Sequence, residues 1–205
     1  MVHRFIRMIT REAICWFGYL IRVSPGQIGI RLRRAIYSRW LNGGPMGLTV
    51  SEGVFINGFD MIKVGNNVSF GRECTVHSAL GEISIGDRCS FNDRVWMGSD
   101  FGSIVIGNNV LVGPYSVFRS ANHKYDGDGP IIDQGHTHGV ITIGDNVWIG
   151  AHVTIIPGAN VGRGSIIAAG AVVNGSIPPH SLATGIPAKV LRRLTDSEQV
   201  TSQER

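Results

Sequence analysis

Histidine supplies the side chains in this chain best suited to proton transfer near neutral pH. Three of the seven histidines, His123, His136 and His138, fall in one polar stretch, SANHKYDGDGPIIDQGHTHGV. An imidazole there can act as a general base that removes a proton from a hydroxyl group, and His123 is the candidate. The competing interpretation is an ordinary loop histidine. Asp126 or Asp128 could orient the ring of His123 through a carboxylate–imidazole hydrogen bond.

The sequence favours no metal centre. His136 and His138 have a spacing that a metal pair could use, but no cysteine or acidic clamp accompanies them. We therefore expect both to face solvent or a partner. The three cysteines at positions 15, 74 and 89 show no paired spacing, which favours a reducing, cytoplasmic location.

A six-residue repeat must position these side chains. From residue 64 onward an apolar residue recurs at every sixth position within each set, and glycine follows nine of the fifteen. The sets are Val64, Phe70 and Val76; Ile85, Phe91 and Met97; Ile106, Val112 and Phe118; Ile143, Ile149 and Ile155; and Val161, Ile167 and Val173.

Period six fits neither an α-helix nor an amphipathic strand, but it fits a triangular coil of three short strands. We expect glycine at the corners because it accepts backbone conformations closed to other residues. Small residues four places further on would let coils stack at a strand spacing of about 4.8 Å; they are Cys74, Val95, Ser116, Ala159 and Ser165. The pattern predicts an all-β parallel β-helix, with a β-sandwich of chance spacing as the alternative.

The spacing of the sets also divides the chain. Coils begin at 64, 85, 106, 143 and 161, and the step of 37 residues contains an inserted loop at 119–142. Residues 45–63 predict an irregular first coil around Val50, Ile56 and Ile62. We therefore expect a basic helical segment at 1–44, a β-helix domain at 45–180, and a C-terminal extension at 181–205 with a short helix and a polar tail.

The N-terminal segment reads as two helices, at 3–22 and 27–41, separated by Ser24–Gly26. Ile28, Leu32, Ile36 and Trp40 would share one face of the second helix. The first 50 residues hold eight arginines against one acid, Glu12. Two interpretations follow: helices packed on the prism or on a neighbouring subunit with arginines in solvent, or a basic amphipathic surface against anionic lipid. Nucleic-acid binding is not expected, because no recognised module is present.

Residues 112–194 resemble the bacterial hexapeptide-repeat O-acetyltransferases, which include galactoside and maltose acetyltransferases and enzymes that acetylate capsule or exopolysaccharide sugars. The shared motifs are IGDNVWIG at 143–150 and GIPAKV at 185–190. The resemblance implies a left-handed β-helix, a homotrimer with active sites between subunits, and acetyl-CoA as the acyl donor.

The resemblance also assigns roles residue by residue. His123 stands where the family has its catalytic histidine. Asn92 or Asp93 lies near the acceptor-binding position, with an ordinary turn residue as the alternative. Trp148 would wall the acceptor pocket, with packing between coils as the alternative. The positions that match the CoA site are Ala151 and Ala169 for the pantetheine arm, Lys189 and Arg192 for the phosphates, and Asn174, which with Gly175 replaces a commoner Thr-Lys pair and so lacks one positive charge.

These observations predict an acetyl-CoA-dependent O-acetyltransferase that acts on a sugar hydroxyl, in surface polysaccharide biosynthesis. Its location would be cytoplasmic, with the N-terminal helices as a peripheral contact to the inner membrane. Transfer to a nucleotide-sugar amine or to serine remains open, as does a non-catalytic β-helix. A γ-type carbonic anhydrase needs two histidines five residues apart, and no histidine pair here has that spacing.

Overall fold

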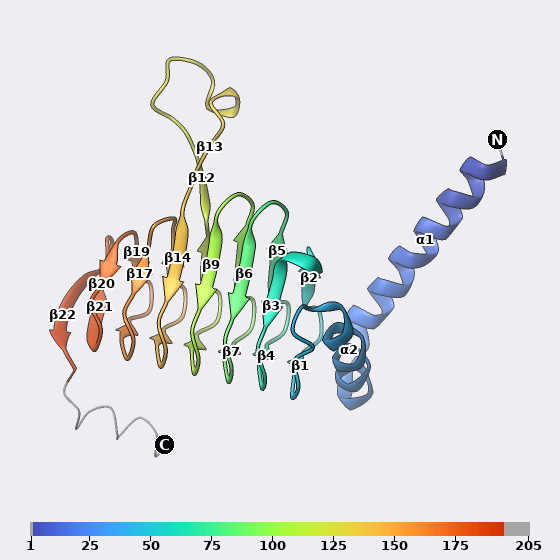
Figure 1. Ribbon diagram of the computed structural model, residues 1–205, viewed down its shortest axis with the longest axis horizontal. Helices are drawn as coiled ribbons and strands as arrows, with labels where there is room; N and C mark the ends of the chain where they lie inside the picture. Colours follow the sequence, from blue (N-terminus) through green and yellow to red (C-terminus); the bar gives the residue numbers. More distant parts are fainter. Residues whose placement is uncertain (1, 195–205) are drawn as a thin grey trace.

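The computed structural model describes residues 2–194, apart from the side chains of residues 2–9, 11 and 14. It is a three-sided prism of stacked coils with two helices at its N-terminal end (Figure 1). Each coil passes through three parallel sheets in turn, and six coils are complete. The predicted all-β fold of hexapeptide coils is confirmed, including the irregular first coil.

The first sheet has eight strands and the other two have six. The first sheet contains β1 Thr49–Val50, β4 Ser69–Phe70, β7 Ser90–Phe91, β10 Leu111–Val112, β15 Trp148–Ile149, β18 Ile166–Ile167, β21 Ser181–Thr184 and β22 Lys189–Arg193. The second contains β2 Phe55–Asn57, β5 Thr75–Ser78, β8 Trp96–Ser99, β11 Val117–Arg119, β16 Thr154–Ile155 and β19 Val172–Val173. The third contains β3 Ile62–Val64, β6 Glu82–Ile85, β9 Ser103–Ile106, β14 Val140–Ile143, β17 Asn160–Val161 and β20 Ser176–Ile177.

The core is the axis of the prism. All fifteen apolar repeat positions are at most 3% exposed, as the period of six predicts. Phe70 and Phe91, one coil apart, stack with ring centroids 5.2 Å apart. The buried side chains therefore form one continuous column that holds the coils in register.

The corner glycines serve a different purpose from the one expected. A Cβ on Gly144 would lie 2.6 Å from the backbone nitrogen of Arg163, and one on Gly86 would lie 2.7 Å from the carbonyl carbon of Gly107. These glycines are needed because the next coil approaches too closely for a side chain. The left-handed conformation is adopted two residues later, with φ near 56°, by non-glycine residues that include Asn67, Arg88, Asn109 and Asn146.

The inserted segment forms a hairpin that projects from the prism (Figure 1). Strands β12 Ala121–His123 and β13 His136–His138 pair antiparallel, and a short 3-10 helix, η2 Ile131–Asp133, lies between them. The insertion is shorter than the predicted 119–142, because Arg119 ends β11 and β14 begins at Val140. We call the corner between the second and third sheets, from which this hairpin departs, the hairpin corner.

The two predicted N-terminal helices are present as α1 Val2–Val23 and α2 Gly26–Trp40. A 3-10 turn, η1 Phe59–Met61, follows in the first coil. None of the described helices is both long enough and apolar enough to span a bilayer.

The buried face of α2 differs from the expected one. Ile28 and Trp40 are exposed, whereas Gly29, Arg33 and Tyr37 are buried. The guanidinium of Arg33 donates to the carbonyl oxygens of Ile21, Ser24 and Val50 at 3.1, 2.6 and 2.9 Å. This arginine is therefore neither in solvent nor free for lipid, because it satisfies carbonyl groups at the junction of both helices and the first coil.

The prediction of a short C-terminal helix is wrong within the described residues, because Lys189–Arg193 form strand β22. β22 turns back and pairs antiparallel with β21, through register pairs such as Thr184 with Lys189. The last coil leaves an open sheet edge with unpaired backbone groups, and β22 covers that edge. The tail from residue 195 lies outside the described residues.

Candidate active site

His123 lies at the root of the hairpin, exposed to solvent. It is the last residue of β12 and pairs across the ladder with His136 of β13, so that their ring centroids are 4.4 Å apart. The ring of His136 in turn lies 5.3 Å from that of Phe101, on the preceding coil. The pairing of the hairpin strands thus places the predicted base in a row of three rings at the hairpin corner.

A row of polar side chains runs along the same corner. Asn57 Nδ2 lies 3.2 Å from His77 Nδ1, and His77 Nε2 lies 3.3 Å from Asp100 Oδ1. The other Asp100 oxygen lies 4.0 Å from Arg119 Nη2, and the Arg119 guanidinium stands 5.7 Å from the centre of the Trp96 ring. These groups offer donors and acceptors for hydroxyls beside the three rings.

Sequence reasoning missed this row, although the register contains a signal for it. Asn57, His77 and Arg119 occupy equivalent rungs of the second sheet, with Gly98 between the last two. Asn57 and His77 are 20 residues apart, and His77 and Arg119 are 42 residues apart, which correspond to one coil and two coils. Polar residues at one repeat position could therefore have been predicted to stack along a single edge.

The hairpin corner also has a hollow of about 340 Å³. Phe101 and Gly102 line it from the prism, and His138 and Gly139 line it from the returning hairpin strand. One side of the ring row is therefore open to a small molecule.

The acids proposed to orient His123 do not contact it. No ion pair within residues 2–194 joins His123 to Asp126 or Asp128. The loop is instead fixed by Gln134, whose amide oxygen accepts from Gly127 N at 2.9 Å and whose amide nitrogen donates to Gly129 O at 2.6 Å. The orientation of His123 comes from strand pairing and ring contacts.

Asn92 and Asp93 lie on a different corner, between the first and second sheets. They line a hollow of about 420 Å³ with Arg94 and Tyr115, and we call this the arginine corner. Asp93 Oδ1 accepts from Arg72 N at 2.7 Å, and Asn92 Oδ1 accepts from Asp93 N at 2.8 Å. Asn92 therefore makes a contact within its own turn, whereas Asp93 links its turn to the backbone of the preceding coil.

The arginine corner also holds an exposed ion pair. Arg94 Nε lies 2.6 Å from Glu73 Oε2, and this hydrogen bond lowers the pKa of Glu73 from its ordinary value. Because both groups are well exposed, the pair adds little stability.

The residues predicted to bind CoA lie toward the C-terminal end of the prism, at the arginine corner, on the first sheet and, for Asn174, at the hairpin corner. Ala151 and Ala169 follow β15 and β18 in successive coils, and the carbonyl of Ala151 accepts from Gly170 N at 2.9 Å. Trp148 is half exposed on the outer face of β15, in register with Ile166. Three further positions are exposed: Lys189 and Arg192 on β22, and Asn174, which follows β19 at the end of the second sheet.

The predicted residues thus form two groups on two edges of the prism. His123 and Asn174 lie at the hairpin corner, whereas Asn92, Asp93, Ala151 and Ala169 lie at the arginine corner. A single protomer does not bring the candidate base and the candidate pantetheine contacts to one edge. Within residues 2–194, no group of three or more histidine, cysteine or acidic side chains is arranged to hold a metal ion.

The sequence resembles those of known transferases. Residues 141–175 match the profile of the bacterial transferase hexapeptide, six repeats. The galactoside O-acetyltransferase of Escherichia coli is 36% identical over 118 residues, which are 57% of each chain. YJL218W of Saccharomyces cerevisiae, an inferred acetyltransferase, is 37% identical over 57% of this chain and 65% of its own length.

The chain is thus similar in sequence to the hexapeptide-repeat transferases. A solved hexapeptide-repeat acetyltransferase, VCA0836 of Vibrio cholerae in complex with acetyl coenzyme A, has 27% identity and a TM-score of 0.59. That likeness covers 86% of this chain and 82% of the other. The family resemblance predicted from the sequence is confirmed. The chain spans less than two thirds of the length of either curated relative named above.

Proposed function

We propose that this protein is an acetyl-CoA-dependent O-acetyltransferase that transfers an acetyl group to a sugar hydroxyl. The observation that carries the proposal is the exposed His123 ring at the hairpin root, beside the rings of His136 and Phe101. The relatives named as acetyltransferases support the reaction class.

In this reaction His123 takes the proton of the acceptor hydroxyl while the oxygen attacks the thioester carbonyl. The C–S bond then breaks, an ester forms, and the CoA sulfur leaves with a proton returned by the imidazolium. Backbone N–H groups beside the thioester would steady the oxyanion that develops on the carbonyl oxygen. CoA would lie along the first sheet, with Ala151 and Ala169 leaving room for the pantetheine arm and Lys189 and Arg192 near the phosphates.

The division of the candidate residues between two corners supports a homotrimer with shared sites. Packing three prisms side by side would set the hairpin corner of one against the arginine corner of the next. His123 from one subunit and Ala151 from its neighbour would then face one cleft. Asn92, Asp93 and Trp148 would contribute to the acceptor side of that cleft.

The hairpin corner has the composition of a sugar site. The exposed ring of Phe101 offers an apolar surface to a sugar ring. Asp100 and Arg119 offer an acceptor and donors for its hydroxyls. We extend the proposal to a unit of a surface polysaccharide and to the cytoplasm, where acetyl-CoA is available as donor.

The test is acetyl transfer from acetyl-CoA to a panel of sugars, with the acetylated product identified by mass spectrometry. We expect His123→Ala to lower kcat by about a hundredfold to ten-thousandfold, the usual range for a general base. Asp126→Asn and Asp128→Asn change the charge of the same loop without touching His123, and they should retain activity.

Serine and a nucleotide-linked amino sugar in the same panel test the alternative acceptors. Transfer to an amine but to no hydroxyl would replace the sugar hydroxyl in the proposal. Turnover of any acceptor that His123→Ala leaves unchanged would refute the assignment of the base.

A further inference from the structure

Helix α1 presents an apolar face that the rest of the protomer does not cover. Figure 1 shows α1 running away from the prism, with only its C-terminal end beside α2. On the described part of α1, Trp16, Phe17 and Leu20 are 63, 58 and 57% exposed. Such large apolar side chains on one element indicate an interaction surface.

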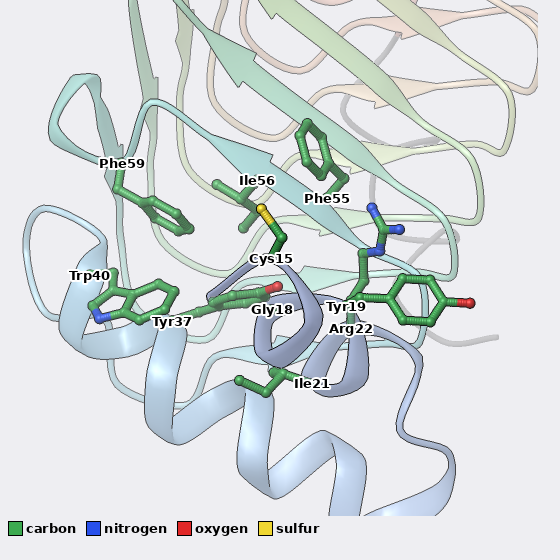
Figure 2. Close-up of a pocket in the computed structure, with 10 residues that line it drawn as sticks. All are labelled: Cys15, Gly18, Tyr19, Ile21, Arg22, Tyr37, Trp40, Phe55, Ile56 and Phe59. Atoms are coloured by element: carbon green, nitrogen blue, oxygen red, sulfur yellow. The ribbon is translucent and has the colours of Figure 1, made fainter. Parts of the chain in front are cut away.

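The opposite side of the helix faces the protein. A hollow of about 300 Å³ separates α1 from α2 and the first coil, and Cys15, Gly18, Tyr19 and Arg22 line it from α1 (Figure 2). Trp16, Phe17 and Leu20 do not line it. The body of the protein therefore lies on one side of α1 and the uncovered apolar face on another.

The charge of this region is strongly positive. Within α1 the sequence has arginine at 4, 7, 11 and 22 and a single acid, Glu12. An α-helix brings positions with these spacings to one side, while positions 13, 16, 17 and 20 fall on the other. On α2, Arg31 and Arg39 are exposed.

From this arrangement we propose that α1 docks on an anionic lipid surface, lying in the interface with Trp16, Phe17 and Leu20 inserted. An amphipathic helix with aromatic residues on one face and arginines on the other binds such a surface through apolar burial and attraction to acidic headgroups. The geometry is also compatible with docking on a membrane, because the prism projects from the polar side of the helix. A second copy of this chain is the competing occupant, but it would have to place acids opposite the arginines.

The experiment is vesicle flotation of the full chain with phosphatidylcholine vesicles and with vesicles that also contain phosphatidylglycerol. The wild-type protein should float with the anionic vesicles and much less with the neutral ones, and added salt should weaken the binding. Replacing the three residues together, Trp16→Ser, Phe17→Ser and Leu20→Ser, should lower the partition coefficient by about tenfold or more.

A matched control is Leu111→Ser, which removes a comparably exposed leucine from the first sheet of the prism. It should bind anionic vesicles as the wild type does. Circular dichroism of each variant reports folding, and light scattering after gel filtration reports the oligomeric state.

Loss of vesicle binding in the triple variant, with fold and oligomeric state retained, supports the proposal. The proposal is overturned if the wild type binds neither kind of vesicle, or if the triple variant binds as well as the wild type. It is also overturned if the triple variant dissociates into smaller species while no form binds lipid, which would assign the face to a second copy.

Discussion

The three cysteines differ in how far burial in the fold lowers the reactivity of their thiols. Cys74 lies inside the prism, where its thiol donates to Asn92 O at 3.0 Å, and burial raises its pKa to about 11. Burial also raises the pKa of Cys89 from its ordinary value. Cys15 is exposed on α1. Because the thiolate is the reactive form, the two buried thiols should be inert at neutral pH.

This difference predicts the outcome of thiol titration. In native protein at pH 7–8 a colour-forming disulfide reagent should modify Cys15 alone, and all three cysteines should react in guanidinium chloride. The Cys15→Ser variant should show no fast phase, which also removes the protein's own background from assays of released CoA. A fast native phase that persists in Cys15→Ser would show that the coils open to solvent.

At the level of the structural elements, the stacking of coils restricts which residues can occupy the corners of the prism. Glycines at the corners allow one coil to contact the backbone of the next, and the left-handed residue that follows donates its N–H to the preceding coil. Asn146 N, for example, donates to Asn108 O at 2.8 Å. Each corner thus satisfies its backbone groups without side-chain bulk.

Gly144→Ala should therefore destabilise the prism. Its Cβ would meet the backbone of Arg163 at 2.6 Å, which no rotamer change can relieve. We expect a loss of about 1–3 kcal/mol in the free energy of unfolding, as for other overpacked sites. The measurement is the free energy of unfolding of Gly144→Ala and Gly175→Ala, obtained from denaturant unfolding curves.

Gly175 is the matched control, because nothing lies within 4 Å of a Cβ built there and its φ is not in the left-handed region. Its replacement by alanine should change stability little. Equal losses in both variants would mean that contact between coils is not what requires glycine at 144.

At the scale of the whole molecule, the proposed site needs more than one subunit. The candidate base and the candidate pantetheine contacts lie on different corners, so their cooperation depends on how prisms pack. A reaction divided between chains has a consequence that a site within one chain lacks: two different inactive variants can complement each other.

Co-expression of His123→Ala with Ala151→Trp provides this test. Each variant alone should be inactive, the first without its base and the second with a blocked pantetheine channel. Each mixed trimer should recover about a third of wild-type activity, because one of its three sites would receive both native residues.

The mixed species is isolated through two different affinity tags and assayed with acetyl-CoA and the acceptor. Complete inactivity of mixed trimers would place both residues in the same subunit's site. Full stability of each variant, checked by thermal melting, is the control.

The spacing of apolar residues determined the prism. A column of stacked side chains needs one inward-facing apolar residue on each side of every coil, and this requirement appears in the sequence as an apolar residue at every sixth position. The same register placed His123 at the start of the inserted loop. Both depend on neighbours in sequence or on a fixed repeat.

Only the tertiary structure revealed the row from Asn57 through His77 and Asp100 to Arg119, the burial of Arg33, and the return of β22 along β21. Each of these depends on which backbone groups and charges meet between separate coils. Carbonyl groups left over at a helix junction bind whichever donor reaches them, and an open sheet edge pairs with whichever strand is near. The local sequence pattern does not predict these hydrogen bonds, ion pairs and strand pairings, because they form only once the coils are stacked.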